Sequence, residues 1–249
     1  MSASLPKSAT APAPATVVRT TGPDATYAVR LCSSAEDLRT AHRIRVSVFH
    51  EEQGFPAESE IDEYDPLSAH FLAIATSKST GESRAVGTIR WVPYPFPPAD
   101  PNFQPGADPA LPIGPVRDQA TVRALFAANK LDVTPGNDKE DEYVKQIKTA
   151  PTLLAGGKLT RLALAKEARG LRIGELLVRE SERWVLDAVR GGVVGGQQQQ
   201  GERLHSSKLV LSSQMPVINF YTRLSYVPVG DVYDEEGAPH QRLEKTVVF

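Results

Sequence analysis

A short basic turn with two glycines is the stretch of this sequence best suited to hold a ligand. The apolar run 159–165 predicts a strand before the turn, and an amphipathic pattern that continues to Val185 predicts a helix after it. Between them lie Arg169, Gly170, Leu171, Arg172, Ile173 and Gly174. A helix start presents unpaired N–H groups and a partial positive charge, and glycine lets the backbone approach a ligand closely. The turn therefore predicts a pyrophosphate site.

Two common phosphate-binding motifs fit this turn less well. A P-loop needs Gly, four residues and then Gly-Lys-Ser/Thr, which is absent, and a dinucleotide fingerprint needs three glycines where only Gly170 and Gly174 occur. An ordinary strand–helix connection, in which a glycine only allows tight packing, remains an alternative. A side chain at Arg172 fits if this residue has right-handed helical geometry, and we expect its guanidinium to point at a phosphate.

A second segment, "SSQMPVINFYTRLSYVPVG", follows the predicted buried strand "KLVLSS" and places Asn219 and Tyr221 in the first turns of a helix. Together the two segments resemble the GNAT superfamily of acetyl-CoA-dependent N-acetyltransferases. The family's Gln/Arg-x-x-Gly-x-Gly/Ala motif is matched at Arg169 and Gly174, with Arg172 in place of the inner glycine. The family's Asn-x-x-x-Tyr-x-x-x-Gly-Phe region is matched less closely, since Asn219 and Tyr221 are nearer together and Ser225-Tyr226 replaces Gly-Phe.

Two further stretches, "VFHEEQGFPAESEIDEYDPLSAHFLA" and "VYDEEGAPHQRLEK", resemble the ElaA-like branch of the superfamily. The resemblance covers about 27–92 and 158–249. It implies an α/β fold of the α+β type, in which helices flank a GNAT-like mixed, mostly antiparallel central sheet. It also implies acetyl-CoA as the co-substrate and an N-acetyltransferase activity.

The resemblance assigns roles to particular residues. The backbone from Arg169 to Gly174 would hold the pyrophosphate, and Asn219 would hydrogen-bond the cofactor or serve only to begin its helix. Strand N–H groups at Leu162, Ala163 and Leu164 would polarise the thioester carbonyl. Tyr221 would protonate the leaving thiolate, with a structural tyrosine as the alternative.

The attacking amine must lose a proton, because an alkyl amine with a pKa near 10 is protonated at neutral pH. The candidate bases are Glu52, Asp62, His70 and His240. Glu52 lies where the first predicted helix meets an acidic loop, and His240 lies on the predicted terminal strand. No spacing rule selects among the four, and a lone histidine is more often a structural hydrogen-bonding residue.

The acidic loop 51–66 contains seven carboxylates, which would draw a cationic amine toward the site or would simply be solvated. It lacks the spaced pattern of a calcium loop, and the scattered histidines have no zinc-ligand spacing, so we expect no metal. We expect the acceptor to be a small-molecule amine, such as an amino sugar or a polyamine. A protein or peptide amine is the alternative acceptor, and a non-catalytic acyl-CoA-binding module is the alternative to an enzyme.

The sequence predicts one acetyltransferase domain over 27–249, after a disordered tail over 1–26. A proline-rich insertion at 93–157 and a low-complexity loop at 191–203 interrupt it. A capping box at Ser33 and Glu36 begins a helix that extends to about His50. A hairpin of 70–77 with 84–92 and a terminal pair of 226–229 with 243–249 complete the expected sheet.

Composition excludes several classes of protein. Lys+Arg number 28 and Asp+Glu 30, a balance that argues against a general nucleic-acid-binding protein. Cys32 is the only cysteine, so neither an intramolecular disulfide nor a cysteine zinc site can form. No apolar run approaches the roughly 18 residues of a membrane span, so we expect no membrane partner. We expect a cytoplasmic protein, with a mitochondrial transit peptide as the alternative, and a homodimer is compatible with the family.

Overall fold

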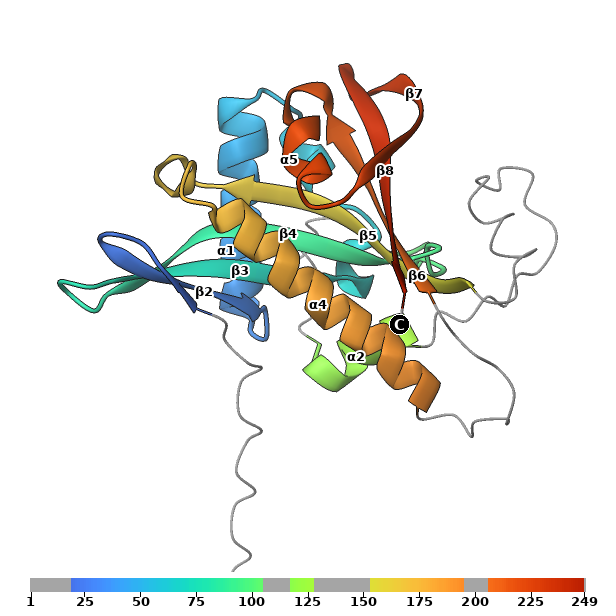
Figure 1. The fold of residues 1–249 in the computed structure, drawn as a ribbon, viewed down its shortest axis with the longest axis horizontal. Helices are drawn as coiled ribbons and strands as arrows, with labels where there is room; N and C mark the ends of the chain where they lie inside the picture. The colour runs from blue at the N-terminus through green and yellow to red at the C-terminus, as the bar shows by residue number, and fades with distance from the viewer. Residues whose placement is uncertain (1–18, 105–116, 128–152, 195–205, 249) are drawn as a thin grey trace, which may run out of the picture.

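A single eight-stranded sheet forms the centre of the computed structural model, which describes residues 19–104, 117–127, 153–194 and 206–248 (Figure 1). The strand order is β1-β2-β3-β4-β5-β6-β8-β7. Every pair of neighbours is antiparallel except β5 and β6, so the predicted mixed, mostly antiparallel sheet is confirmed. The strands are β1 (Arg19–Thr21), β2 (Ala25–Leu31), β3 (Ala69–Ser77), β4 (Ser83–Tyr94), β5 (Leu153–Leu164), β6 (Ser206–Gln214), β7 (Val227–Glu235) and β8 (Ala238–Val248).

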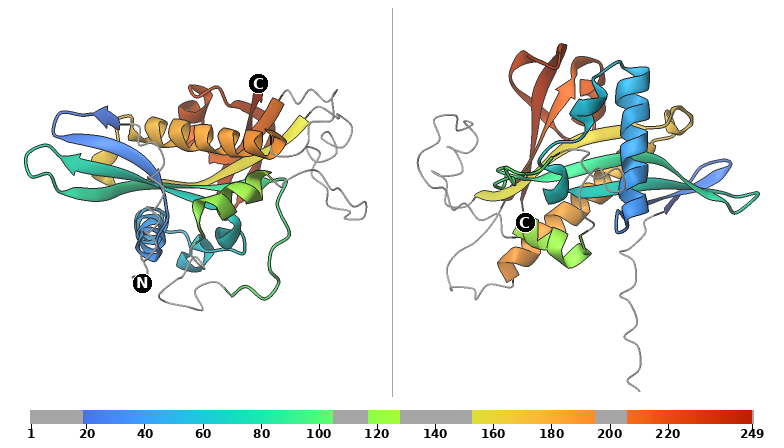
Figure 2. Two further views of the ribbon diagram at one scale, coloured as in Figure 1. Left: turned by 90° about the horizontal axis from the view of Figure 1, so that it is seen from below. Right: turned by 180° about the vertical axis from the view of Figure 1, so that it is seen from behind.

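Helices cover both faces of the sheet (Figure 2). Helix α1 (Ala35–Arg45), which continues into the π-helix η1 (Val46–Glu52), lies on one face, and α4 (Ile173–Val194) lies on the other. The remaining helices are α2 (Gln119–Ala127), α5 (Ile218–Thr222) and the 3-10 turns η2 (Ala57–Glu60), η3 (Asp65–Leu67), η4 (Lys166–Ala168) and η5 (Met215–Val217).

The apolar face of α4 forms the main core against the sheet. Ile173, Leu177 and Val185 are almost fully buried there, together with Trp91 of β4. The indole N–H of Trp91 donates to the hydroxyl of Ser181 at 2.8 Å, so the one polar atom of this ring is satisfied inside the core. The long helix is therefore fixed to the middle of the sheet, and the turn at its N-terminus is held in place.

The cap of α1 lies one residue later than the predicted pair of Ser33 and Glu36. The hydroxyl of Ser34 accepts from the amide of Asp37 at 3.1 Å, and the carboxylate of Asp37 accepts from the amide of Ser33 at 3.0 Å. The box is therefore Ser34 with Asp37. Asp37 is preferred over Glu36 because its carboxylate also pairs with Arg30 of β2 at 2.5 Å.

The insertion is shorter at both ends than the predicted 93–157, because β4 continues to Tyr94 and β5 begins at Leu153. Pro93 pairs with Gly157, although a proline cannot donate to a ladder. The strand tolerates it because the pairing with β3 ends at Trp91, so β4 has only one neighbour there.

Part of the insertion belongs to the core. Helix α2 packs against α4, and the ring of Phe126 meets that of Trp184 edge-on at a centroid distance of 5.8 Å. The predicted tail ends earlier than residue 26, since β1 begins at Arg19, and the loop predicted from 191 begins later, since α4 extends to Val194. Residues 1–18 and 195–205 of these two segments lie outside the described residues.

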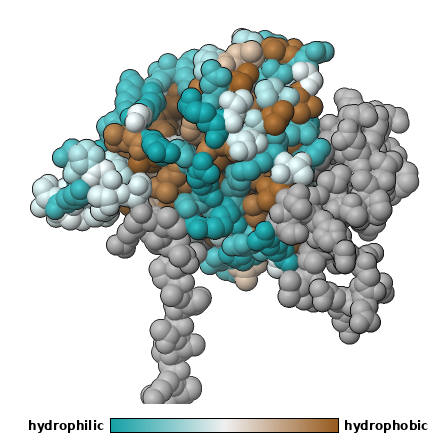
Figure 3. Space-filling model, in the orientation of Figure 1, coloured by the Kyte–Doolittle hydropathy of each residue, from teal (hydrophilic) through white to brown (hydrophobic). Residues whose placement is uncertain are grey.

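The predicted terminal strand pair is present and longer than expected, because β7 and β8 form a hairpin over 227–248. β7 is the edge strand of the sheet. It exposes the large apolar side chains of Val227, Val229, Val232 and Tyr233, and Figure 3 shows apolar surface over this part of the molecule.

Candidate active site

The parallel strands β5 and β6 separate before they end. Their paired residues run only as far as Leu159 with Leu211, whereas β5 continues to Leu164 and β6 to Gln214. A bulge lies on the other side of β5, where the register with β4 shifts between Thr88 and Arg90. The end of β5 therefore has backbone groups that face β6 without a paired strand.

The turn after β5 leads directly into α4. Gly170 has φ 73°, which favours glycine, and no atom lies within 4 Å of the position that a Cβ would take there. Arg172 has φ 60°, so its backbone is in the left-handed region. The right-handed helical geometry that we expected to make room for its side chain is therefore wrong. The helix begins only at Ile173, one residue after this conformation.

Unpaired amides gather at this turn. The amide of Arg169 donates to the carbonyl of Lys166 at 3.2 Å, and the amide of Leu176 donates to that of Arg172 at 3.1 Å. Within the described residues, none of the amides between these two, over 170–175, makes a hydrogen bond of good geometry. Such a group of N–H donors at the start of a long helix is suited to an anion.

The two arginines of the turn differ in their contacts. Arg169 donates to the carbonyl of Leu164 at 2.8 Å and forms an ion pair with Glu52 of η1 at 2.9 Å. It therefore fixes the last carbonyl of β5 to the end of the first helical segment. Arg172 is exposed, and its partner among the described residues is Glu175, at 2.8 Å.

A cleft of about 620 Å³ lies beside the gap between β5 and β6. Its walls come from the end of η1 and the acidic loop, from β4 and β5, and from the ends of β6 and β8. Of the predicted chemical residues, Tyr221, His240 and Asp62 line this cleft, together with the backbone region of Leu162. Glu52, His70 and Asn219 do not line it; Asn219 is an exposed residue in the first turn of α5.

Tyr221 is buried, and burial raises the pKa of its phenol above the ordinary value. Its ring packs against Phe220 and Tyr226, with centroid distances of 4.9 and 6.1 Å. Its hydroxyl makes no hydrogen bond within the described residues, although the residue lines the cleft. A protonated phenol held in this way is a proton donor at neutral pH.

His240 lies at the mouth of the gap, because it is the register partner of Gln214, the last residue of β6. Its Nδ1 lies 2.9 Å from the carbonyl of Ala238, which can only accept, so Nδ1 carries the hydrogen. Nε2 of the neutral ring is then a free acceptor. The ring stacks on Tyr233 at a centroid distance of 6.5 Å, which fixes its orientation. His240 therefore stays a candidate for the base.

The other three base candidates are held in different roles. Asp62 accepts two hydrogen bonds from Arg90, at 2.7 and 2.8 Å; although burial would raise its pKa, the bonds and charge of Arg90 outweigh burial and lower it. Glu52 is paired with Arg169. His70 is buried away from the cleft, where its Nε2 lies 2.9 Å from the carbonyl of Asp65.

The acidic loop is largely neutralised by arginines that no sequence motif indicates. Asp65 lies 2.8 Å from Arg45 and 2.9 Å from Arg90, and Glu60 lies 3.4 Å from Arg45. These ion pairs are buried, where an unpaired charge would be costly. With Asp62 and Arg161, the network contains three guanidiniums and three carboxylates, so these acids are not free to attract a cation. Arginines inside apolar runs, as in "TIRWV" and "KLTRLAL", were the available signal.

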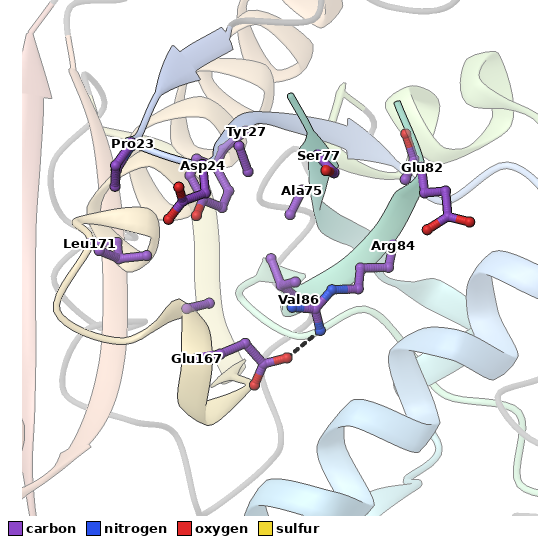
Figure 4. A pocket seen from close by; sticks show the side chains of 13 residues that line it. Pro23, Asp24, Tyr27, Ala75, Ser77, Glu82, Arg84, Val86, Glu167 and Leu171 are labelled. Carbon is purple, nitrogen blue, oxygen red and sulfur yellow. Dashed lines mark hydrogen bonds and ion pairs between the residues drawn. The ribbon is translucent and has the colours of Figure 1, made fainter. Parts of the chain in front are cut away.

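A second cavity, of about 700 Å³, lies on the other side of the turn, between the ends of β2 to β4 and η4 (Figure 4). Arg84 of β4 reaches across to pair with Glu167 there. None of the predicted catalytic residues lines it. The smaller cleft is therefore the better candidate for chemistry, although the second cavity shares Leu171 with the turn.

The described residues contain neither a metal-binding cluster nor a membrane-spanning helix. In the part of the chain that the structure covers, no three His, Cys, Asp or Glu side chains are grouped so that they could hold a metal ion. No described helix is both long and apolar enough to span a membrane.

A bulged strand, a gap between parallel strands and an amide-rich helix start thus meet at one end of the sheet. No family model matches the chain. A Bacillus subtilis (strain 168) protein named "Putative acetyltransferase" is 42% identical over 59 residues, which are 22% of this chain and 40% of that protein. The chain thus spans less than half the length of this relative.

Solved structures share the fold. FeeM, an N-acyl amino acid synthase from uncultured soil microbes, is 14% identical, with a TM-score of 0.50 over 88% of this chain and 90% of that one. A putative N-acetyltransferase from Lactobacillus plantarum is 17% identical, with a TM-score of 0.48 over 88% and 97%. Escherichia coli ElaA is 16% identical, with a TM-score of 0.45 over 89% and 99%. The resemblance predicted from the sequence is confirmed at the level of the fold: the match to FeeM shows the shared fold, and a putative N-acetyltransferase and ElaA are among the matched structures.

Proposed function

We propose that the protein is an acetyl-CoA-dependent N-acetyltransferase that transfers acetyl to the primary amine of a small molecule by direct attack. One observation carries the proposal. The unpaired edge of β5 extends from the cleft, at Thr160, to the amide-rich turn after Leu164. A long, thin molecule with a diphosphate at one end and a reactive group at the other matches this path.

The turn fits the diphosphate of coenzyme A. Its free amides, the partial positive charge of a 22-residue helix and the guanidiniums of Arg169 and Arg172 all favour an anion. The open space beside Gly170 leaves room for phosphate oxygens. Acetyl-CoA would supply the activated acetyl group, as a thioester, to the cleft.

The residues of the chain would then divide the remaining work. Backbone N–H groups from Leu162 to Leu164 would stabilise negative charge on the carbonyl oxygen. His240 would take one proton from the acceptor ammonium at Nε2. Tyr221 would give its hydroxyl proton to the departing sulfur and would regain a proton from the nitrogen that becomes the amide. Asn219 would contact the cofactor outside the cleft.

A small molecule is the preferred acceptor because the cleft is walled by the acidic loop on one side and by the β7–β8 hairpin on the other. Amino sugars and polyamines, which the sequence suggests, belong in the test. The attraction expected between the acidic loop and a polycation is weaker than the sequence implied, because Glu60, Asp62 and Asp65 are already paired. A peptide amine is the alternative within the enzyme class.

Two measurements test the function. Isothermal titration with acetyl-CoA is expected to give micromolar or tighter binding, and a lack of binding would remove the cofactor from the proposal. Release of the CoA thiol over a panel of small amines and lysine-containing peptides is expected to be stimulated by a small amine. Binding without release by any amine would instead indicate an acyl-CoA-binding module.

The base is tested by substitution. His240→Gln keeps a polar side chain on β8 but removes the base, and it is expected to lower kcat by about 100-fold with little change in acetyl-CoA affinity. His50→Gln, at an exposed histidine outside the cleft, is the matched control. If Asp62→Asn lowered kcat by about 100-fold while His240→Gln kept full activity, Asp62 would be the base instead of His240.

A further inference from the structure

Arg161 occupies an unusual position at the mouth of the gap. It lies in the bulge of β5 opposite β4, and its φ of 52° is in the left-handed region. A non-glycine residue is seldom found there, and the conformation turns its side chain away from the regular alternation of the strand. The side chain lines the cleft and is 22% exposed.

The guanidinium of Arg161 is less satisfied than those of its neighbours. Its Nη2 donates to the carbonyl of Ser59 at 2.5 Å. Its Nε lies 3.5 Å from Glu60 but is buried without a hydrogen bond, and its Nη1 makes no hydrogen bond within the described residues. A buried donor without a partner is costly, so this fork is suited to a further acceptor.

The carboxylates nearby are bound more closely by other arginines. Asp62 lies 2.7 Å from Arg90 but 3.6 Å from Arg161, and Asp65 lies 2.8 Å from Arg45. Burial, followed by the positive charges of Arg90 and Arg45, lowers the pKa of Arg161 from its ordinary value. The carboxylates of Glu60 and Asp62 oppose this shift, so the charges of the network are balanced, and the case for a further acceptor rests on the hydrogen-bonding capacity that the guanidinium of Arg161 has left over.

The cleft has walls of different charge. Lys158 and Arg161 come from β5, whereas Glu235, Glu236 and His240 come from the β7–β8 hairpin across the cleft. Glu235 is already hydrogen-bonded to Ser212. On the loop side, Arg45 and Arg90 hold Glu60 and Asp62, whereas Glu63 has no ion pair within the described residues. An acceptor with a cationic and an anionic end would match both walls.

We propose that the acceptor amine carries a carboxylate, and that Arg161 binds this carboxylate while the amine faces His240. The inference rests on the proposed function and names its substrate class. Nε is fully buried, but Nη1 and the second hydrogen of Nη2 make no hydrogen bond within the described residues, and this end of a planar guanidinium can bind a carboxylate through two hydrogen bonds. The residue thereby determines specificity and takes no part in proton transfer.

The experiment uses sets of three amines that differ only at the carboxylate: tyrosine, tyramine and tyrosinamide, and the corresponding lysine set with cadaverine and lysinamide. For each set we expect kcat/KM to be about 10- to 100-fold higher for the free acid. The amide separates this effect from amine basicity, because an amide lowers the amine pKa at least as far as a carboxylate does. A preference for the amide or the decarboxylated amine would overturn the proposal.

Arg161→Gln is expected to raise KM for the free acid and to bring the three kcat/KM values within about threefold of each other. Arg161→Lys, which keeps the charge but not the fork, is expected to retain part of the preference. Arg183→Gln, at an exposed arginine of α4 outside the cleft, is the control. Thermal unfolding and acetyl-CoA affinity verify folding, and the wild-type comparison decides the question if both Arg161 variants fail to fold.

The outcomes separate the two proposals. Acetylation of all amines regardless of the carboxylate, or an unchanged preference in Arg161→Gln, would refute the role of Arg161 and leave the acetyltransferase function intact. Failure of every amine to release CoA would refute the function itself, and the inference with it. A preference for glucosamine 6-phosphate over glucosamine, with no preference for free acids, would mean that the cleft recognises a phosphate on the acceptor. That result would overturn the proposal of a carboxylate.

Discussion

Tyr221 combines two properties that seldom occur together, a buried ring and a hydroxyl without a hydrogen-bond partner within the described residues. Burial raises the pKa of its phenol, so the hydroxyl keeps its proton at neutral pH; the same shift makes the phenol a weaker acid, so its role in catalysis must be tested. We predict that Tyr221→Phe lowers kcat by about 100-fold, while acetyl-CoA affinity and thermal stability stay within the range of the wild type. Steady-state kinetics on the best amine of the panel, with titration of acetyl-CoA, measure both.

Tyr27→Phe is the control for this substitution, since Tyr27 is a buried tyrosine of β2 outside the cleft. Its kcat should be unchanged. A Tyr221→Phe enzyme with full activity would mean that the thiolate leaves without help from this phenol, and that Tyr221 is a structural tyrosine.

Substitutions at Arg172 can separate the effect of its backbone conformation on stability from the effect of its charge on cofactor binding. In the left-handed region, glycine is favoured over arginine, so Arg172→Gly should raise the free energy of unfolding by up to about 1 kcal/mol. If the guanidinium contacts a phosphate, both Arg172→Gly and Arg172→Ala should weaken acetyl-CoA binding by about fivefold. Chemical denaturation and isothermal titration give the two quantities.

Arg179→Ala is the matched control for Arg172, because Arg179 pairs with the same Glu175, at 3.0 Å, one turn further along α4. It should leave acetyl-CoA binding unchanged. Unchanged or tighter binding in Arg172→Gly would show that the arginine is only tolerated in the turn.

At the scale of single residues, the sequence named Tyr221, His240 and Asp62, which line the cleft, and also Glu52 and His70, which do not. The ion pairs of Asp62 and Glu52 could not be predicted because their partners are distant in sequence: Arg90 is 28 residues from Asp62, and Arg169 is 117 residues from Glu52. The local signal for Arg161 was only an arginine within an apolar run, since its conformation depends on a bulge in the pairing with β4.

At the scale of elements, the site depends on the parallel pairing of β5 with β6, which ends where the gap beside the cleft begins. A Cβ at Gly156 would lie 1.9 Å from the carbonyl oxygen of Lys208, a backbone atom of β6 that cannot move away cheaply. We predict that Gly156→Ala destabilises the protein by at least about 3 kcal/mol, because the two parallel strands would be forced apart at their paired end. Urea unfolding followed by circular dichroism measures the loss.

Gly191→Ala is expected to have the opposite effect on stability to Gly156→Ala. This residue lies in α4 with no atom within 4 Å of its Cβ position, so alanine should stabilise the helix by about 0.5–1 kcal/mol. If Gly156→Ala unfolded at the same urea concentration as the wild type, the pairing of β5 with β6 near Gly156 would be wrong.

The order of elements could be predicted from periodicity, and the strands β3, β4, β5 and β6 were all expected near their observed places. Their ends were less certain, for a physical reason. Pro93 argued against a strand, yet β4 continues through it, since a neighbour is missing on that side. Helix α2 was assigned to an insertion because its polar surroundings hid the burial of Val122 and Phe126 against α4. The gap between β5 and β6 is a property of register, which a single strand does not reveal.

At the scale of the whole molecule, one sheet joins the cofactor turn, the cleft and the buried ion-pair network, so the stability of the network affects the whole site. His70 lies beside this network, in contact with Asp65, and is its one histidine within the described residues. Burial lowers its pKa to about 4, against the ordinary 6.5; the carboxylate of Asp65 at 3.7 Å opposes this shift, while the charges of Arg45 and Arg90 add to it. The ring is therefore neutral in the folded protein at neutral pH.

The sign of the pH dependence follows from this shift. Because the folded pKa lies below the unfolded one, the unfolded chain binds a proton first as the pH falls. The stability from His70 is complete above about pH 6.5, declines between 6.5 and 4, and falls no further below 4. The loss is on the order of 3 kcal/mol. Asp65, whose pKa is also lowered, continues the loss in more acidic solution.

His70→Gln tests this at the level of the molecule, because a glutamine amide can still donate to the Asp65 carbonyl but cannot be protonated in this range. Free energies of unfolding, measured in urea at half-unit steps from pH 7.5 to 4, should decline less steeply for His70→Gln than for the wild type. His50→Gln, at an exposed histidine, should follow the wild-type curve. Parallel curves for the wild type and His70→Gln would mean that the acid sensitivity of the fold arises elsewhere in the network, with the carboxylates of Glu60, Asp62 and Asp65 as the remaining titratable groups.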